Sequence, residues 1–333
     1  MLKGHGDDIY RYKGITMNFS SNVYGHFDHS GLFAYLSERL PMVQNYPSPS
    51  ADELVADLSE VLRIDRDNVC VTNGATEAIY LIAQIFAGQP CTVLAPAFAE
   101  YADACEMYSS PVHHAVSLNE VDADTKVVWL CNPCNPTGAV MDKTTLMDYI
   151  CAHPEKVFVV DASYSHYTMC PVPNATELLL PNVLMLHSMT KEFGVPGLRL
   201  GYVTGTKEMI ALLDAHRMPW SVNQLAIDAG RYLLAHKDDY AIDLPMLMSE
   251  REKVGRAMQQ MGMKVAPSDT HILLAELPCG SAAELKDRLA RNHGILIRDA
   301  SNFHSLTERH FRIAVQRPEE NDCLLNALEE LRS

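Results

Sequence analysis

An apolar run near the middle of the chain is followed by Ser188-Met189-Thr190-Lys191-Glu192-Phe193-Gly194-Val195-Pro196-Gly197-Leu198-Arg199, in which Lys191 lies 30 residues beyond Asp161. A lysine forms a Schiff base only when its amine is unprotonated and held beside a carbonyl, so its surroundings must lower its pKa and fix its position. Short hydroxyl side chains, glycines and one arginine surround Lys191. The stretch therefore predicts a lysine that carries an aldehyde.

The neighbours of Lys191 also suit a phosphate group. Ser188, Thr190 and Arg199 could bind one through their side chains, and Gly194 and Gly197 let the backbone approach it closely. A reactive lysine beside a phosphate-binding site is typical of a protein that binds a phosphorylated aldehyde. We therefore expect pyridoxal phosphate as the cofactor.

The composition favours an enzyme of one large or two medium domains. With 333 residues and 47% apolar content the chain can bury a large core. A net charge of −15 argues against nucleic acid or an anionic membrane as a partner. The first residues lack the apolar core of a signal peptide, and no run reaches the ~18 apolar residues of a membrane span. These features predict a cytoplasmic protein.

The cysteines favour free thiols without a metal. Their number is nine, which is odd, and they are scattered along the chain, as is typical of reduced thiols. Cys131 and Cys134 have the CxxC spacing of a zinc or redox site. A zinc site would need a second pair or nearby histidines, and none follows. We expect no metal.

The region from residue 68 to 205 alternates short β-rich runs with helical stretches. Short strands that are almost wholly apolar are typical of a largely parallel sheet covered by helices on both faces. Ligands of such sheets bind at the carboxyl ends of the strands, where the polar residues fall here. The predicted strands are 68–72, 92–95, 126–130, 157–160, 183–186 and 201–204.

The pattern beyond Trp220 changes to longer helices, predicted at 223–235 and 241–261, followed by short strands around 270–277, 295–298 and 311–315. We interpret this as a second, smaller α/β domain. The predicted organisation is an N-terminal arm at 1–45, a large cofactor-binding domain at 46–220 and a small C-terminal domain at 221–333, with the long helix bridging the last boundary.

Two motifs at strand ends have both a functional and an ordinary interpretation. Asn73-Gly74-Ala75-Thr76-Glu77-Ala78-Ile79 could bind a phosphate at the first turn of a helix, or could be a simple strand-to-helix turn with Thr76 or Glu77 near its cap. Asp161 could cap the next element or pair with a cationic group. A pyridinium nitrogen would be such a partner, and the carboxylate would keep the ring protonated.

Three further candidates are weaker when each is taken alone. Asn135-Pro136-Thr137-Gly138 is a common turn sequence. Tyr164 could reach a phenolic oxygen of the cofactor or pack at a sheet edge. Phe98 could stack on the pyridine ring or belong to the core.

The order and spacing of these motifs together resemble the fold-type I pyridoxal phosphate enzymes, in the class I/II aminotransferase superfamily. The resemblance covers nearly the whole chain. It implies an α/β fold, with a large domain built on a mostly parallel sheet flanked by helices and a smaller α/β C-terminal domain. It also implies that Lys191 carries the cofactor, that Asp161 pairs with the pyridine nitrogen, and that Asn135 and Tyr164 hold the phenolic oxygen.

The resemblance assigns the cofactor phosphate to the backbone of Ala75 and Thr76 and to the side chains of Ser188, Thr190 and Arg199. Tyr46, in Asn45-Tyr46-Pro47, matches a tyrosine that reaches the phosphate of the neighbouring subunit. A homodimer with shared active sites is therefore expected.

The substrate side of the resemblance concerns Arg298 and Arg312, which match arginines that bind substrate anions. Two branches of the superfamily are similar, histidinol-phosphate aminotransferase and threonine-phosphate decarboxylase. The decarboxylase branch is favoured by Gly4-His5-Gly6, Phe19-Ser20-Ser21-Asn22, Pro96-Ala97-Phe98-Ala99-Glu100-Tyr101, Met218-Pro219-Trp220-Ser221-Val222-Asn223 and Ile295-Leu296-Ile297-Arg298-Asp299-Ala300-Ser301-Asn302-Phe303. His5 and Asn22 from these runs are also expected at the substrate.

The sequence departs from that branch at two places. Asp7-Asp8 replaces a glycine and an asparagine, which places acids near the expected substrate entrance, and Ala162-Ser163 replaces Glu-Ala. The leading hypothesis is decarboxylation of L-threonine O-3-phosphate, a phosphorylated amino acid, to aminopropanol phosphate in cobalamin biosynthesis. The alternatives are transamination of histidinol phosphate or another amino acid, and a noncatalytic ligand-binding relative.

Overall fold

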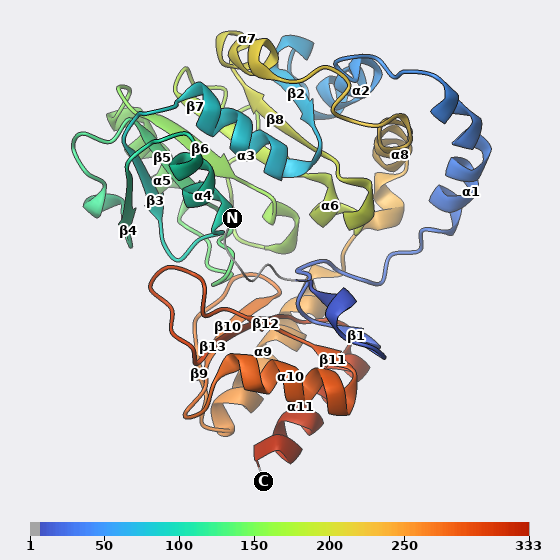
Figure 1. Ribbon diagram of the computed structural model, residues 1–333, viewed down its shortest axis with the longest axis vertical. Helices are drawn as coiled ribbons and strands as arrows, with labels where there is room; N and C mark the ends of the chain where they lie inside the picture. The colour runs from blue at the N-terminus through green and yellow to red at the C-terminus, as the bar shows by residue number, and fades with distance from the viewer. Residues whose placement is uncertain (1–6, 333) are drawn as a thin grey trace.

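The computed structural model describes residues 7–332, and its centre is a seven-stranded sheet (Figure 1). The strand order is β2-β8-β7-β6-β5-β3-β4, and every neighbouring pair is parallel except the two that involve β8. The predicted, largely parallel α/β sheet is therefore confirmed. Its strands are β2 (Val69–Thr72), β3 (Cys91–Leu94), β4 (Val112–Ala115), β5 (Val127–Cys131), β6 (Val157–Asp161), β7 (Val183–Ser188) and β8 (Gly201–Gly205).

Helices cover both faces of this sheet, which explains the apolar strands. In β5, Val127 and Trp129 pack in one core cluster with residues of three helices, while Val128 and Leu130 pack in another with a fourth. All four side chains are buried. Successive strand residues point to opposite faces, so neither face of β5 tolerates a polar side chain. The first face carries α3 (Gly74–Ile85), α4 (Glu100–Met107) and α7 (Lys207–His216), and the other carries α5 (Lys143–Ala152).

Strand β4 was not predicted from the sequence. It lies at the edge of the sheet and pairs only with β3. Two of its four residues are His113 and His114, and only Ala115 is fully buried. An edge strand has one neighbour to pack against, so it lacks the continuous apolar run that marks the central strands.

A second, antiparallel sheet of four strands forms the core of the C-terminal part, drawn in orange and red in Figure 1. Helices α9 (Leu244–Gln260), α10 (Ala282–His293) and α11 (Pro318–Arg332) bury Leu247, Leu289 and Leu324 in the same core cluster as this sheet. The strands, in spatial order, are β12 (Arg298–Asp299), β13 (His310–Ala314), β10 (Ile272–Glu276) and β9 (Lys264–Val265).

The N-terminal segment contacts both parts of the molecule. Strand β1 (Met17–Asn18) pairs in parallel with β11 (Ile295–Leu296) of the C-terminal part, whereas α1 (Ser30–Arg39) packs on α8 (Gln224–Ala235). The segment predicted as an arm is therefore held at two places.

Helix α8 packs with the large sheet, although the sequence analysis assigned it to the small domain. Its residues Ile227 and Leu233 share a core cluster with Val71 of β2 and with Leu54 of α2 (Asp52–Leu62). We therefore propose that the smaller domain begins after α8, later than residue 221. Within residues 7–332, no helix has the length and apolar content that crossing a bilayer requires.

Candidate active site

A cavity of about 280 Å³ lies at the carboxyl ends of the central strands, where the C-terminal sheet faces them. Among the residues lining it are all those predicted for the cofactor and the substrate that the structure describes, except Tyr46; His5 lies outside the described residues. These lining residues are Asn22, Ala75, Thr76, Phe98, Asn135, Asp161, Tyr164, Ser188, Thr190, Lys191, Arg199, Arg298 and Arg312.

Lys191 lies on the short helix α6 (Met189–Glu192) that directly follows β7. Its Nζ donates a hydrogen bond to the backbone oxygen of Ser21 at 2.9 Å. Burial, helped by the charges of Arg312 and Arg199, lowers the pKa of Lys191 to about 8, although Asp7 and Asp161 act in the opposite direction. The cavity thus holds a lysine whose neutral form is readily populated.

The lowered pKa of Lys191 predicts how the protein without cofactor captures an aldehyde. Only the neutral amine attacks a carbonyl, so the capture rate should rise about tenfold per pH unit below a pKa of about 8 and level off above it. Stopped-flow absorbance with pyridoxal phosphate measures this rate. A rate that continues to rise tenfold per unit up to the ordinary lysine value of 10.5 would contradict the assignment.

The same shift has a consequence for stability. Between the two pKa values of about 8 and 10.5 the unfolded chain binds more protons at Lys191 than the folded chain does. The contribution of this group to the free energy of unfolding therefore rises with pH across that window.

Asp161 ends β6, and its carboxylate points into the cavity from a buried position. The phenol of Tyr101 donates to its Oδ2 at 2.6 Å, and the backbone N–H of Ser163 donates to its Oδ1 at 2.9 Å. Burial and the charge of Asp161 raise the pKa of Tyr101, so this phenol stays a donor at neutral pH. The two donors fix the carboxylate in one orientation, as a partner for a ring nitrogen requires.

Tyr101 was not predicted as a site residue, although it ends the run from Pro96 that we quoted for the resemblance. It lies in the first turn of α4, and nothing in its sequence neighbourhood indicates a carboxylate from β6. The contact joins residues 60 positions apart.

The first turn of α3 and the guanidinium of Arg199 approach each other closely. Gly74 has a φ of +73°, and a Cβ there would lie 2.6 Å from Nη2 of Arg199. A Cβ on Gly201 would lie 2.7 Å from the backbone nitrogen of Ala75. Because only glycine fits at both positions, the sequence keeps an open cradle between the helix N-terminus and the arginine.

Thr190 adds an unused donor to this cradle. Its Oγ1 is buried, lines the same cavity and has no hydrogen-bond partner within the described part of the chain. A buried hydroxyl without a partner is costly, so it indicates a ligand that accepts its hydrogen bond. Helix N–H groups, a guanidinium and free hydroxyls are the groups that bind a phosphate.

Lys191, Asp161 and the cradle therefore fit the three polar ends of pyridoxal phosphate: its aldehyde, its ring nitrogen and its phosphate. Phe98 lines the same space, with its ring edge-on to Tyr101 at a centroid distance of 5.9 Å. Within residues 7–332, no group of three or more His, Cys, Asp or Glu side chains is arranged to hold a metal ion.

Arg298 and Arg312 lie opposite each other on β12 and β13 and project into the other end of the cavity, called here the substrate end. Both are buried, at 5% and 3% exposure. Burial lowers the pKa of Arg312 to about 9, and the neighbouring charge of Arg298 acts in the same direction. Two buried cations side by side are unfavourable unless an anion joins them.

The protein partners of these two arginines are neutral. Arg298 donates from Nη2 to Oδ1 of Asn302 at 2.7 Å, and Arg312 donates from Nη1 to Oδ1 of Asn135 at 2.6 Å and from Nη2 to the backbone oxygen of Ser20. Neither makes an ion pair with a carboxylate among the described residues. The substrate end is thus prepared for an external anion.

Asn22 and Tyr164 connect the two ends of the cavity. Nδ2 of Asn22 donates to the phenolic oxygen of Tyr164 at 2.9 Å, and Oδ1 of Asn22 is buried without a partner in the described chain. Burial raises the pKa of Tyr164, so its phenol is protonated at neutral pH. Asn135 likewise lies between the predicted cofactor position and Arg312.

Two predicted residues are not in the cavity as the structure describes it. Tyr46 is 86% exposed and packs its ring against Trp220, with a centroid distance of 5.4 Å. His5 lies outside the described residues. The cavity wall also includes Asp7, which was expected near the substrate entrance, and Ser20 and Ser21, which were not predicted as site residues.

Comparisons with known proteins identify related sequences and structures. The model of the family described as aminotransferase class I and II matches residues 15–328. A protein of Caldanaerobacter subterraneus subsp. tengcongensis, provisionally named threonine-phosphate decarboxylase, is 30% identical, covering 98% of this chain and 93% of its own length. Histidinol-phosphate aminotransferase of the same organism is 32% identical, covering 87% of this chain and 85% of its own.

A solved structure is similar over almost the whole fold. The crystal structure of L-threonine-O-3-phosphate decarboxylase from Porphyromonas gingivalis has a TM-score of 0.91 and 36% identity, covering 95% of this chain and 99% of its own. The fold is thus that of the fold-type I pyridoxal phosphate enzymes. Because the family model matches most of its length, the chain belongs to the aminotransferase class I and II family and is a pyridoxal phosphate-dependent enzyme.

Proposed function

We propose that the enzyme decarboxylates L-threonine O-3-phosphate to aminopropanol phosphate, a reaction of cobalamin biosynthesis. The observation that carries the proposal is the pair of buried guanidinium groups of Arg298 and Arg312, whose partners among residues 7–332 are all neutral. A substrate phosphate would supply the missing charge. The similarity to two proteins named for threonine-phosphate decarboxylation supports the same choice.

The bound cofactor supplies an electron sink for the pair of electrons left on the substrate when a bond at Cα breaks. Asp161 is placed to hold a proton on the ring nitrogen, which keeps that sink effective. Asn135 and Tyr164 are placed to hold the phenolic oxygen. The presence of all three side chains in the lining of one cavity supports these roles.

The arginine pair would decide which bond at Cα breaks. Anchoring a substrate phosphate at Arg298 and Arg312 would leave the α-carboxylate without an arginine to hold it, so that the bond to CO₂ could be the one that breaks. A carboxylate held by an arginine would instead leave the Cα–H bond aligned, as transamination requires. Lys191 would return a proton to Cα after CO₂ has left.

A keto acid requirement tests this proposal. Decarboxylation has no amino-group acceptor, so L-threonine O-3-phosphate should be consumed equally fast with and without 2-oxoglutarate. Consumption that depends on the keto acid would contradict the decarboxylase and favour the alternative, an aminotransferase acting on histidinol phosphate or another amino acid. The 32% identical histidinol-phosphate aminotransferase supports that alternative.

A homodimer with shared active sites is also proposed. Exposed apolar side chains gather on the 3₁₀ turn Leu40–Gln44 and around Trp220, where Tyr46 is found. A second copy covering this surface would remove it from water and could bring Tyr46 to the partner's cofactor phosphate. Sedimentation velocity showing only a monomer would contradict this. The cytoplasmic location stays a prediction.

A further inference from the structure

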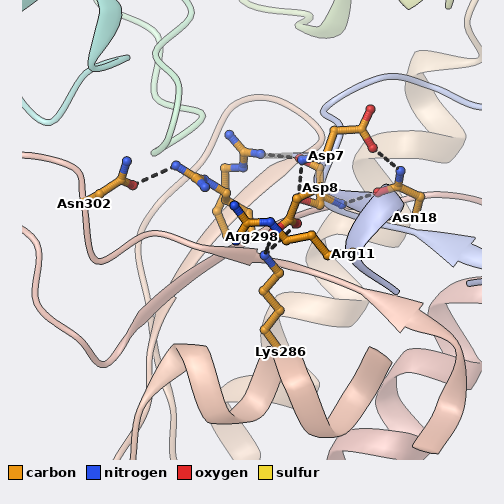
Figure 2. Close-up of polar contacts among 9 residues, drawn as sticks. Asp7, Asp8, Arg11, Asn18, Lys286, Arg298 and Asn302 are labelled. Atoms are coloured by element: carbon orange, nitrogen blue, oxygen red, sulfur yellow. Dashed lines mark hydrogen bonds and ion pairs between the residues drawn. The ribbon is translucent and has the colours of Figure 1, made fainter. Parts of the chain in front are cut away.

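A buried ion pair lies beside the substrate end and has no part in the chemistry described above. Nζ of Lys286, on α10, donates to Oδ1 and Oδ2 of Asp8 at 2.6 and 2.7 Å (Figure 2). Asp8 is 5% exposed and Lys286 is 8% exposed. The pair joins residues 278 positions apart, and Lys286 does not line the cavity.

Stability alone is a poor explanation for such a pair. Burying two charges costs about as much free energy as their attraction returns, and apolar replacements are often neutral. The location of the ion pair beside the substrate end indicates a role in substrate binding instead.

The chain around Asp8 is held firmly at the cavity. Asp7, which lines the cavity, donates its backbone N–H to Oγ of Ser20 at 3.2 Å and accepts at Oδ1 from Nδ2 of Asn18 at 2.6 Å (Figure 2). Asp7 has a φ of +59°, a conformation that such contacts must maintain. Asp8 is thus kept near the substrate end by its neighbour as well as by Lys286.

Two more cations lie near Asp8: Arg11, which is 60% exposed and lies 3.8 Å from its Oδ2, and the buried Arg298. Burial lowers the pKa of Arg298, and the charges of Asp299 and Asp8 oppose that effect. Yet Arg298 makes no ion pair with Asp8 in the described structure, because both carboxylate oxygens of Asp8 are bound by Lys286. Figure 2 shows Lys286 and Arg11 beside Asp8, with Arg298 turned toward Asn302.

We propose that Lys286 is a positioning residue for substrate binding: it occupies the Asp8 carboxylate and thereby leaves Arg298 available to a substrate anion. Without Lys286, the buried Asp8 carboxylate would keep only its long pair with the exposed Arg11, at 3.8 Å, and Asp7 would keep it from turning away. Arg298 would then be the buried cation open to it, and Asp8 would compete with the substrate for Arg298. The identity of the anion as a phosphate rests on the proposed function.

Binding measurements on cofactor-loaded variants test this inference, with L-threonine O-3-phosphate and inorganic phosphate as separate probes. Lys286→Met should weaken L-threonine O-3-phosphate binding about tenfold or more, while cofactor loading stays as in the wild type. Lys286→Arg should bind within about threefold of the wild type, because it still pairs with Asp8. Arg291→Met, which breaks an exposed pair with Asp287 on the same helix, should change nothing.

The double variant Asp8→Asn/Lys286→Met separates this role from a merely structural one. It removes the competing carboxylate, so its affinity should return to within about threefold of the wild type. Equal binding by Lys286→Met and the wild type, or a double variant as weak as Lys286→Met, would overturn the inference. If Lys286→Met does not fold, the double variant still tests the inference, because it has no unpaired buried charge. Its affinity for the probe is then compared with that of the wild type, and an affinity more than about threefold weaker would overturn the inference.

The two proposals fail in different ways. If the wild type does not bind L-threonine O-3-phosphate, the proposed function fails, and the same set of variants is then compared with inorganic phosphate. If the wild type binds the probe and Lys286→Met binds it equally well, the inference about Lys286 fails and the proposed function stands.

Discussion

Lys191→Ala is expected to lower kcat by about 10³-fold or more while leaving the fold intact. The only lysine lining the cavity, within the described chain, is Lys191, so no second amine can take over its role. In the structure its Nζ makes one hydrogen bond, to a backbone oxygen. Loss of that bond and of a buried amine should change the melting temperature little. Steady-state kinetics and thermal unfolding of the purified variant measure both effects.

Lys264→Ala provides the matched control for this change. Lys264 is 83% exposed and pairs with Glu276 on the C-terminal sheet, far from any role in the cavity. It should retain wild-type kcat. A Lys191→Ala protein with wild-type activity would contradict the whole assignment of the cavity as an active site.

Arg312→Ala is expected to reduce kcat/KM about 10²-fold or more and to spare cofactor loading. Arg312 faces the substrate end, so truncation removes a buried, charge-assisted anchor for the substrate anion. Asn135 also loses its donor, but the cradle at Gly74, Thr190 and Arg199 is untouched. Kinetics with the phosphorylated substrate and a spectroscopic titration with pyridoxal phosphate separate the two effects.

Arg309→Ala is the control, because Arg309 precedes the same strand, is 39% exposed and pairs with Glu276. Its kcat/KM should be unchanged. A loss of cofactor affinity in Arg312→Ala as large as the loss of kcat/KM would show that Arg312 belongs to the cofactor site instead.

The central strands could be predicted because each is buried on both faces and therefore reads as a short apolar run. Strand β4 has a histidine pair at a sheet edge, and β9 and β12 have two residues each, so they carry no such pattern. The packing of helix α8 on the large sheet could not be predicted, because an apolar helix face does not indicate which sheet it covers.

The site could be predicted where one segment carries the chemistry. Lys191 and Arg199 share a stretch, and Asp161 ends a recognisable strand, so motif order placed them correctly at one sheet edge. Contacts between distant segments gave no signal. Three such contacts depend on tertiary packing, which pairs residues without any local sequence pattern. They join Tyr101 to Asp161, the Ser21 carbonyl to Lys191, and Asp8 to Lys286.

The most direct test of the proposed reaction is CO₂ release when cofactor-loaded enzyme meets L-threonine O-3-phosphate with no keto acid present. The arrangement of Arg298 and Arg312 predicts CO₂ and aminopropanol phosphate in equal amounts, each matching the substrate consumed. Consumption without CO₂, or no reaction until a keto acid is added, would contradict the decarboxylase and point to transamination.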